Sequence, residues 1–110
     1  MPSLFEITAG SLAGPTDGGT VTQATNKGTA VTLSTESGQI TMNNAALADA
    51  AEVSFTVTNT KVAATDVVVA CHGSAGTAGA YIVSANSIAA GSFKITVSNV
   101  SGGSLSEAIV

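Results

Sequence analysis

Alternation of apolar and polar residues recurs along most of the chain and predicts β-strands. The clearest case is "EVSFTVTN" (52–59), in which Val53, Phe55 and Val57 alternate with polar residues. Because neighbouring side chains of a strand point to opposite faces, this pattern is typical of a strand with one buried face. In all, the pattern and its turn signals predict about eight strands, at 20–25, 29–34, 38–42, 52–59, 66–72, 80–85, 92–99 and 104–110.

The segments between and within these strands carry their own signals. The turn "NKG" (26–28) between the first two strands predicts a β-hairpin. "NNAALADAA" (43–51) has a helix-forming composition but is short, so we expect a loop with one turn. "DVVVACH" (66–72) is apolar on both faces, which is typical of a strand that is buried or lies in a subunit interface. Val68 and Ala70 are the candidate interface residues.

A weak internal repeat relates two parts of the chain. "LADAAEVSFTVTNTKVAATDVVVA", from Leu47, resembles "IAAGSFKITVSNVSGGSLSEAIV", from Ile88. With one gap, the repeat aligns Phe55 with Ile95, Val57 with Val97, Asn59 with Asn99 and Val69 with Ile109. Two such units packing face to face predict an all-β fold, an antiparallel β-sandwich or jelly-roll-like domain.

Composition agrees with an all-β domain and separates one terminal segment from it. The 110 residues suffice for one domain, and β-branched residues, serine and glycine dominate while only 9% are charged. Residues 1–18 run from "MPSLFEIT" into a turn-rich stretch, which indicates an N-terminal arm before a β-sandwich domain at 19–110. A frayed terminus is the alternative. Because Leu4, Phe5 and Ile7 are costly to leave in water, we expect the arm to dock on a protein surface.

The net charge argues against nucleic acid and anionic membranes as partners. A net charge of −4, with three lysines and no arginine, disfavours binding to nucleic acid or to an anionic membrane surface. No apolar run reaches the length that crosses a bilayer. The single cysteine excludes an internal disulfide and fits synthesis in a reducing cytoplasm.

The stretch "ACHGSAGTAGAY" (70–81) contains residues that could form a catalytic pair or a phosphate-binding loop, but its pattern fits neither site. In a strand Cys71 and His72 point to opposite faces, so they cannot act as nucleophile and base. The loop at 73–79 lacks the lysine of a phosphate-binding loop, since Gly79 is followed by Ala80. The acidic residues show no spacing of a catalytic pair or a calcium loop. We therefore expect no catalytic residue, no metal and no cofactor, and disfavour an enzyme.

Four stretches carry a resemblance to a known family: "GGTVTQATNKGTAVTL", "GQITMNNAALA", "AEVSFTVTNTKVAATDVVV" and "GTAGAYIVSANSIAAGSFKITVSNVSGGSLSEAIV". Together, over residues 18–110, they resemble a small domain widespread in tailed bacteriophages. That domain occurs as a stand-alone virion protein and at the C-terminal tip of fibre-like proteins. Its members carry a few more apolar residues after "SLSEAIV", so the last strand here is expected to be shorter.

The resemblance implies a location in the virion, after synthesis in the bacterial host cytoplasm, and leaves two functions open. The first is a capsid decoration (cement) protein. Such a protein would be a homotrimer that binds the major capsid protein on the outer surface and stabilises the head. We expect the arm residues Leu4, Phe5 and Ile7 to make that contact, by adding a strand to a capsid element.

The second function is a fibre tip that recognises a host-cell glycan. The loop after 66–72 would then form the receptor site, through Gly73, Ser74, Thr77 and Tyr81. Sugar sites favour exposed aromatic rings, and this chain has only one tyrosine, three phenylalanines and no tryptophan. The shortage favours the decoration protein.

Overall fold

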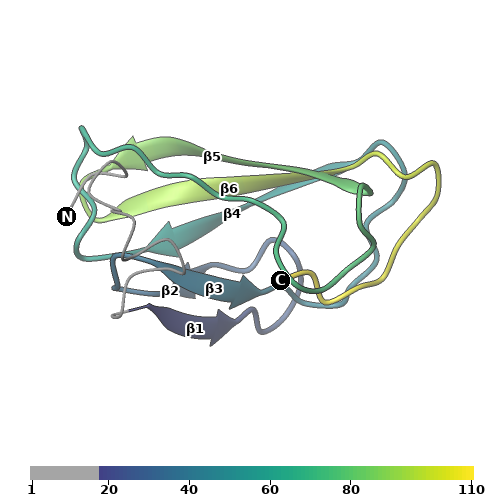
Figure 1. Cartoon of the computed structure of the whole chain (residues 1–110), viewed down its shortest axis with the longest axis horizontal. Helices are drawn as coiled ribbons and strands as arrows, with labels where there is room; N and C mark the ends of the chain where they lie inside the picture. The colour runs from purple at the N-terminus through teal and green to yellow at the C-terminus, as the bar shows by residue number, and fades with distance from the viewer. Residues whose placement is uncertain (1–17) are drawn as a thin grey trace.

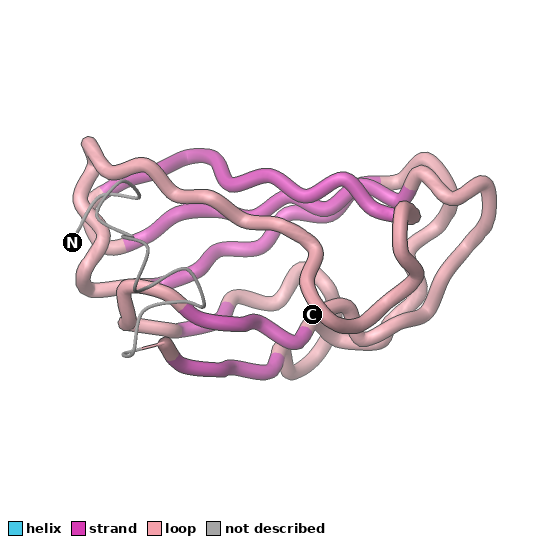
Figure 2. The backbone as a smooth tube through the Cα atoms, viewed as in Figure 1, coloured by secondary structure: helices cyan, strands magenta, loops and turns pink. Residues whose placement is uncertain are grey.

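Six β-strands in two sheets form the regular structure of residues 18–110, the part of the chain that this computed structural model describes (Figures 1 and 2). The strands are β1 (Gly19–Thr22), β2 (Val31–Thr32), β3 (Gly38–Thr41), β4 (Glu52–Thr58), β5 (Tyr81–Ala89) and β6 (Ser92–Asn99). The prediction of an all-β fold is confirmed. Within the described residues, no helix is long and apolar enough to cross a membrane.

The larger sheet has four strands in the order β2-β4-β6-β5. Its centre is the antiparallel pair of β4 and β6, with Phe55 opposite Ile95 and Val53 opposite Val97. The alternation expected from the sequence is confirmed here, since Phe55 is only 3% exposed and Val97 1%. The loop predicted at 43–51 is also confirmed, and it contains a single turn.

The smaller sheet consists of β1 and β3, which run parallel with Gly19 opposite Gly38. The two backbones approach so closely that a Cβ atom at Gly38 would lie 2.7 Å from the carbonyl oxygen of Gly19. A backbone atom cannot give way like a side chain, so this position requires glycine. Val21 and Ile40 of this sheet pack against the core cluster that contains Phe55 and Val97, so both sheets share one core.

The predicted hairpin between the first two strands is wrong. The turn forms, with the Thr29 amide donating to the Asn26 carbonyl, but β1 pairs with β3 and β2 pairs with β4, both in parallel. The side chain of Gln23, 2% exposed, explains why. Its amide donates to the carbonyls of Lys27 (2.8 Å) and Thr29 (2.9 Å), taking the place of hairpin pairing.

The strands predicted at 66–72 and 104–110 are also wrong. Residues 67–71 make no hydrogen bond within the described part of the chain, and Val67 and Val69 are 58% and 62% exposed. The last residues pair only at single points, with Leu105 in an isolated bridge to Leu47 and the Ile109 carbonyl accepting from the Met42 amide. Local alternation describes an extended chain, but a strand also needs a neighbour for its backbone groups.

The internal repeat is visible as two matching polar turns. Asn59 follows β4 and Asn99 ends β6, and both are buried. The Asn59 side-chain oxygen accepts from the Lys61 amide at 2.8 Å, and that of Asn99 accepts from the Ser101 amide at 2.9 Å. The repeat breaks down further on, because Val69 is exposed on the surface whereas its partner in the alignment, Ile109, is 3% exposed.

Candidate functional site

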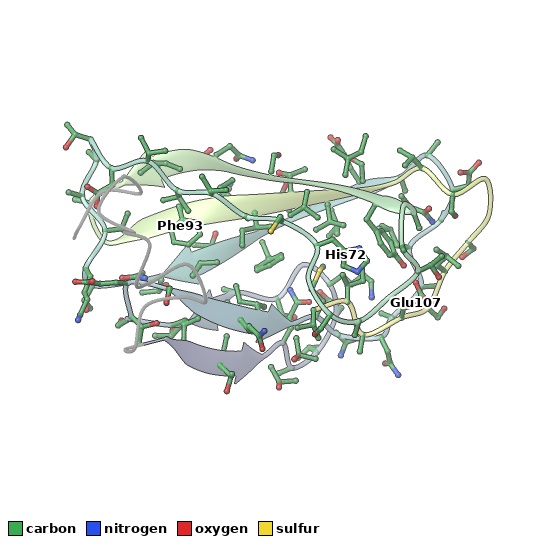
Figure 3. The ribbon with its side chains drawn as sticks, in the orientation of Figure 1. His72, Phe93 and Glu107 are labelled. Atoms are coloured by element: carbon green, nitrogen blue, oxygen red, sulfur yellow. The ribbon has the colours of Figure 1, made fainter. Side chains whose placement is uncertain are left out.

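The carboxylate of Glu107 joins the glycine-rich loop to the last segment of the chain (Figure 3). Its Oε1 accepts hydrogen bonds from the Thr77 amide at 2.9 Å and from the Tyr81 hydroxyl at 2.6 Å. Its Oε2 accepts from the Thr77 hydroxyl at 2.7 Å. Tyr81 begins β5, so Glu107 links the sheet, the loop and the C-terminal segment in one cluster.

His72 belongs to the same cluster. Its ring meets that of Tyr81 edge to face, with 5.6 Å between the centroids. Its Nε2 lies 2.6 Å from the Ala75 carbonyl, which can only accept, so Nε2 carries the proton. Gly76 packs beneath this ring with a φ of +102°, and a Cβ there would lie 3.1 Å from Nε2. The loop therefore needs glycine both for its backbone and for space.

Hydrogen bonds and burial in the cluster shift two pKa values in opposite directions. The Tyr81 hydroxyl, and then the amide and hydroxyl of Thr77, lower the pKa of the Glu107 carboxyl from its ordinary value. Burial raises the pKa of the Tyr81 phenol to about 12, and the hydrogen bond and negative charge of Glu107 act in the same direction. The cluster thus holds an ionised carboxylate beside a protonated phenol.

A second polar cluster, around Lys27, also contacts Glu107. Lys27 is only 3% exposed. Its Nζ donates to the backbone carbonyls of Asn43 and of Glu107, the latter at 2.6 Å. Burial lowers the pKa of Lys27, although attraction to Glu107 opposes this effect. The Asn43 amide also donates to Gln23 Oε1 at 3.0 Å, so the segments around residues 23–29, 43 and 107 are held together.

These contacts hold the loop, the start of β5 and the C-terminal segment together. The Glu107 oxygens are occupied by donors of the protein itself, and the His72 ring is turned to Ala75 and Tyr81. Cys71 is a free, exposed thiol. Among residues 18–110, no group of three histidine, cysteine or acidic side chains could hold a metal ion.

The predicted receptor-loop residues are only partly brought together. Thr77 and Tyr81 meet at Glu107, whereas the Gly73 amide donates to the Val110 carbonyl at 2.7 Å and Ser74 is exposed. Tyr81 is 8% exposed, so its ring faces the core.

The other predicted site residues are placed as follows. Val68 and Ala70 are half-buried, and Ala70 packs against the core cluster. Leu4, Phe5 and Ile7 lie outside the described residues. Comparison with family models, with curated proteins and with solved structures finds no match for this chain.

Sequence reasoning missed Glu107 and Lys27. A signal for Glu107 exists, because it alternates with Leu105 and Ile109 and therefore lies on their apolar face. A carboxylate on such a face needs hydrogen-bond partners. Lys27 has no comparable signal, since a lysine in a turn is ordinarily solvated.

We expect the Glu107→Gln variant to change the pH dependence of stability. The folded-state pKa of Glu107 is lowered, so its contribution is present above the ordinary value of 4.5 and is lost as the pH falls through the folded value. The folded-state pKa of Tyr81 is raised, so its contribution is present below the ordinary value of 10 and is lost as the pH rises through about 12. Without the carboxylate, Tyr81 should titrate closer to 10.

Tyr81 is the only tyrosine, so ultraviolet absorbance of the phenolate measures it directly. Glu52→Gln is the matched control, because Glu52 is exposed and its carboxylate accepts only one long hydrogen bond, from Ser98 Oγ at 3.5 Å. An unchanged Tyr81 titration in Glu107→Gln would contradict the hydrogen bond between the Tyr81 hydroxyl and the Glu107 carboxylate.

Proposed function

We propose that this chain is a bacteriophage virion structural protein, a trimeric decoration (cement) protein that binds the outer capsid surface and stabilises the head. The resemblance of residues 18–110 to the bacteriophage domain supports the virion location. The observation that carries the assembly is the pair Val67 and Val69, exposed to 58% and 62%. Adjacent apolar side chains left in water favour contact with another protein surface.

In this proposal the contact between subunits is made by Val67 and Val69. The sequence favoured Val68 and Ala70 on the same segment, but these are half-buried within the domain. Association suits a small domain with few charges, because a closed trimer buries apolar surface that a monomer exposes.

The finer architecture that we propose is a jelly-roll-like sandwich with the two sheets as its layers. The shared core supports it, since Val21 and Ile40 of the small sheet pack on the cluster that includes Phe55 of the large sheet. The strands β1 to β4 also alternate between the two sheets, as strands connected across the two layers of a sandwich do. The pairs β1-β3 and β2-β4 are parallel, which departs from the all-antiparallel pairing expected from the sequence.

The test is the number of copies per purified particle, measured by quantitative mass spectrometry against the major capsid protein. We expect a ratio comparable to that of the capsid protein for the wild type. We expect a large loss for Val67→Lys combined with Val69→Lys, because two charges would enter the subunit contact. Ile82→Lys is the matched control, since Ile82 is equally exposed at 60% but lies on β5.

The other outcomes are equally informative. A handful of copies per particle would overturn the decoration role in favour of a fibre tip that recognises a glycan. Absence from the particle would overturn both. Wild-type copy numbers in the double lysine variant would show that Val67 and Val69 are not the contact.

A further inference from the structure

The strand β3 has one paired and one open edge. Backbone groups of a strand alternate between its two edges. The Thr41 carbonyl accepts from the Gln23 amide at 2.8 Å, on the side of β1. Gly38 and Ile40, which alternate with it, direct their backbone groups to the other side. Within the described residues neither makes a hydrogen bond there.

The same edge of β3 is occupied further along, by the end of the chain. The Met42 amide donates to the Ile109 carbonyl at 2.8 Å. Val110 in turn exchanges hydrogen bonds with the loop beyond, since its carbonyl accepts from Gly73 at 2.7 Å and its amide donates to Ala75 at 3.1 Å. The last two residues thus lie between Met42, which follows β3, and the loop at 73–75.

A second unpaired stretch borders this arrangement. Residues 67–71 lead directly into Gly73 and make no hydrogen bond within the described part of the chain. They approach the chain end from the same end of the domain at which β3 starts (Figure 1). The β3 edge at Gly38 and Ile40 and residues 67–71 thus have backbone groups without a partner among the described residues. Such groups are the condition for adding a strand.

We propose that the N-terminal segment of this same chain, residues 3–8, adds as a strand to these open edges. Its sequence "SLFEIT" alternates, with Phe5 and Ile7 on one face and Leu4 and Glu6 on the other. In that position Phe5 and Ile7 would face the core. Phe93, near the start of β6, is only partly buried although it packs against the core, and it lies at the end of the domain where β3 starts (Figure 3).

The chain length favours its own arm as the occupant. Gly19 pairs with Gly38, so the arm leaves the domain one strand away from the open edge. Residues 9–17, when extended, span about 30 Å at roughly 3.3 Å per residue. Crossing β3 requires only about 10 Å, two strand spacings. A tethered segment within such reach has an effective concentration of roughly millimolar, which favours it over a free partner.

This assignment is independent of the proposed function and differs from the capsid anchor expected from the sequence. An anchor leaves the free protein unchanged when it is removed. A strand that completes the fold protects backbone amides in the free protein.

The experiment is hydrogen exchange on the free, full-length protein and on a variant that lacks residues 1–8. We expect the amides of Gly38 and Ile40 and of residues 67–71 to exchange about tenfold faster or more in the deletion, because their partner is lost. A synthetic peptide of residues 1–12 should restore protection. The matched variants are Phe5→Asp, which should mimic the deletion, and Leu4→Asp on the outer face, which should not.

Three outcomes would overturn the proposal. Equal exchange in both proteins would show that the arm does not dock on these edges. If protection disappears on dilution, and sedimentation shows an oligomer that dissociates over the same concentrations, the edges bind the arm of a second copy. Protection that arises only on capsid particles would assign the arm to the capsid.

Discussion

Replacing Phe55 with alanine is expected to lower the free energy of unfolding by about 3–5 kcal/mol. Phe55 lies opposite Ile95 at the centre of the larger sheet and is 3% exposed. It belongs to the core cluster against which residues of both sheets pack. Truncation therefore removes buried apolar surface and leaves a cavity that the surrounding side chains fill only in part. Urea denaturation of the purified domain measures the loss.

Ser84→Ala provides the comparison, because Ser84 lies exposed on β5 and its loss should cost less than about 0.5 kcal/mol. A loss well under about 1 kcal/mol for Phe55→Ala would mean that the ring does not fill the core.

Asn99→Ala is expected to cost about 2–4 kcal/mol, because it leaves buried backbone groups without partners. Asn99 is fully buried at 0% exposure. Its amide donates to the carbonyls of Leu47 and Gly103, both at 2.8 Å, and its side-chain oxygen accepts from Ser101 at 2.9 Å. The Leu47 contact matters most, since that residue is 6% exposed and water cannot easily replace the donor.

The change in unfolding free energy is again read from urea denaturation. Asn44→Ala is the matched control, because Asn44 is exposed in the same chain and should cost little. Asn59→Ala should give an intermediate loss, since the Asn59 amide makes one such contact, to the Thr35 carbonyl at 2.8 Å. A loss for Asn99→Ala no larger than that for Asn44→Ala would contradict the role of this side chain.

These polar side chains explain how short strands make a stable fold. Gln23, Lys27, Asn43, Asn59 and Asn99 each bond backbone groups of another segment, where a larger sheet would use strand pairing. No buried side-chain nitrogen or oxygen among residues 18–110 lacks a hydrogen-bond partner. Full satisfaction of such groups favours one arrangement of the chain, because any alternative leaves some of them unpaired in the interior.

The sequence by itself determined the all-β class and, for the two central strands β4 and β6, which face is buried. Alternation in 52–59 and 92–99 placed Phe55 and Ile95 on the inner face, and the structure pairs them directly. The repeat placed asparagine after both strands, and both form the same kind of turn. These features depend on residues within a few positions of one another, so a local pattern is enough to predict them.

Only the tertiary structure decided which extended segments become paired strands and which polar residues meet. The chain at 66–72 has the composition of a buried strand, yet no strand of residues 18–110 pairs with it. Lys27 and Glu107 are separated by 80 positions, and each alone resembles an ordinary solvated charge. A hydrogen bond needs both of its groups in place, and the second group comes from a part of the chain that no local pattern identifies.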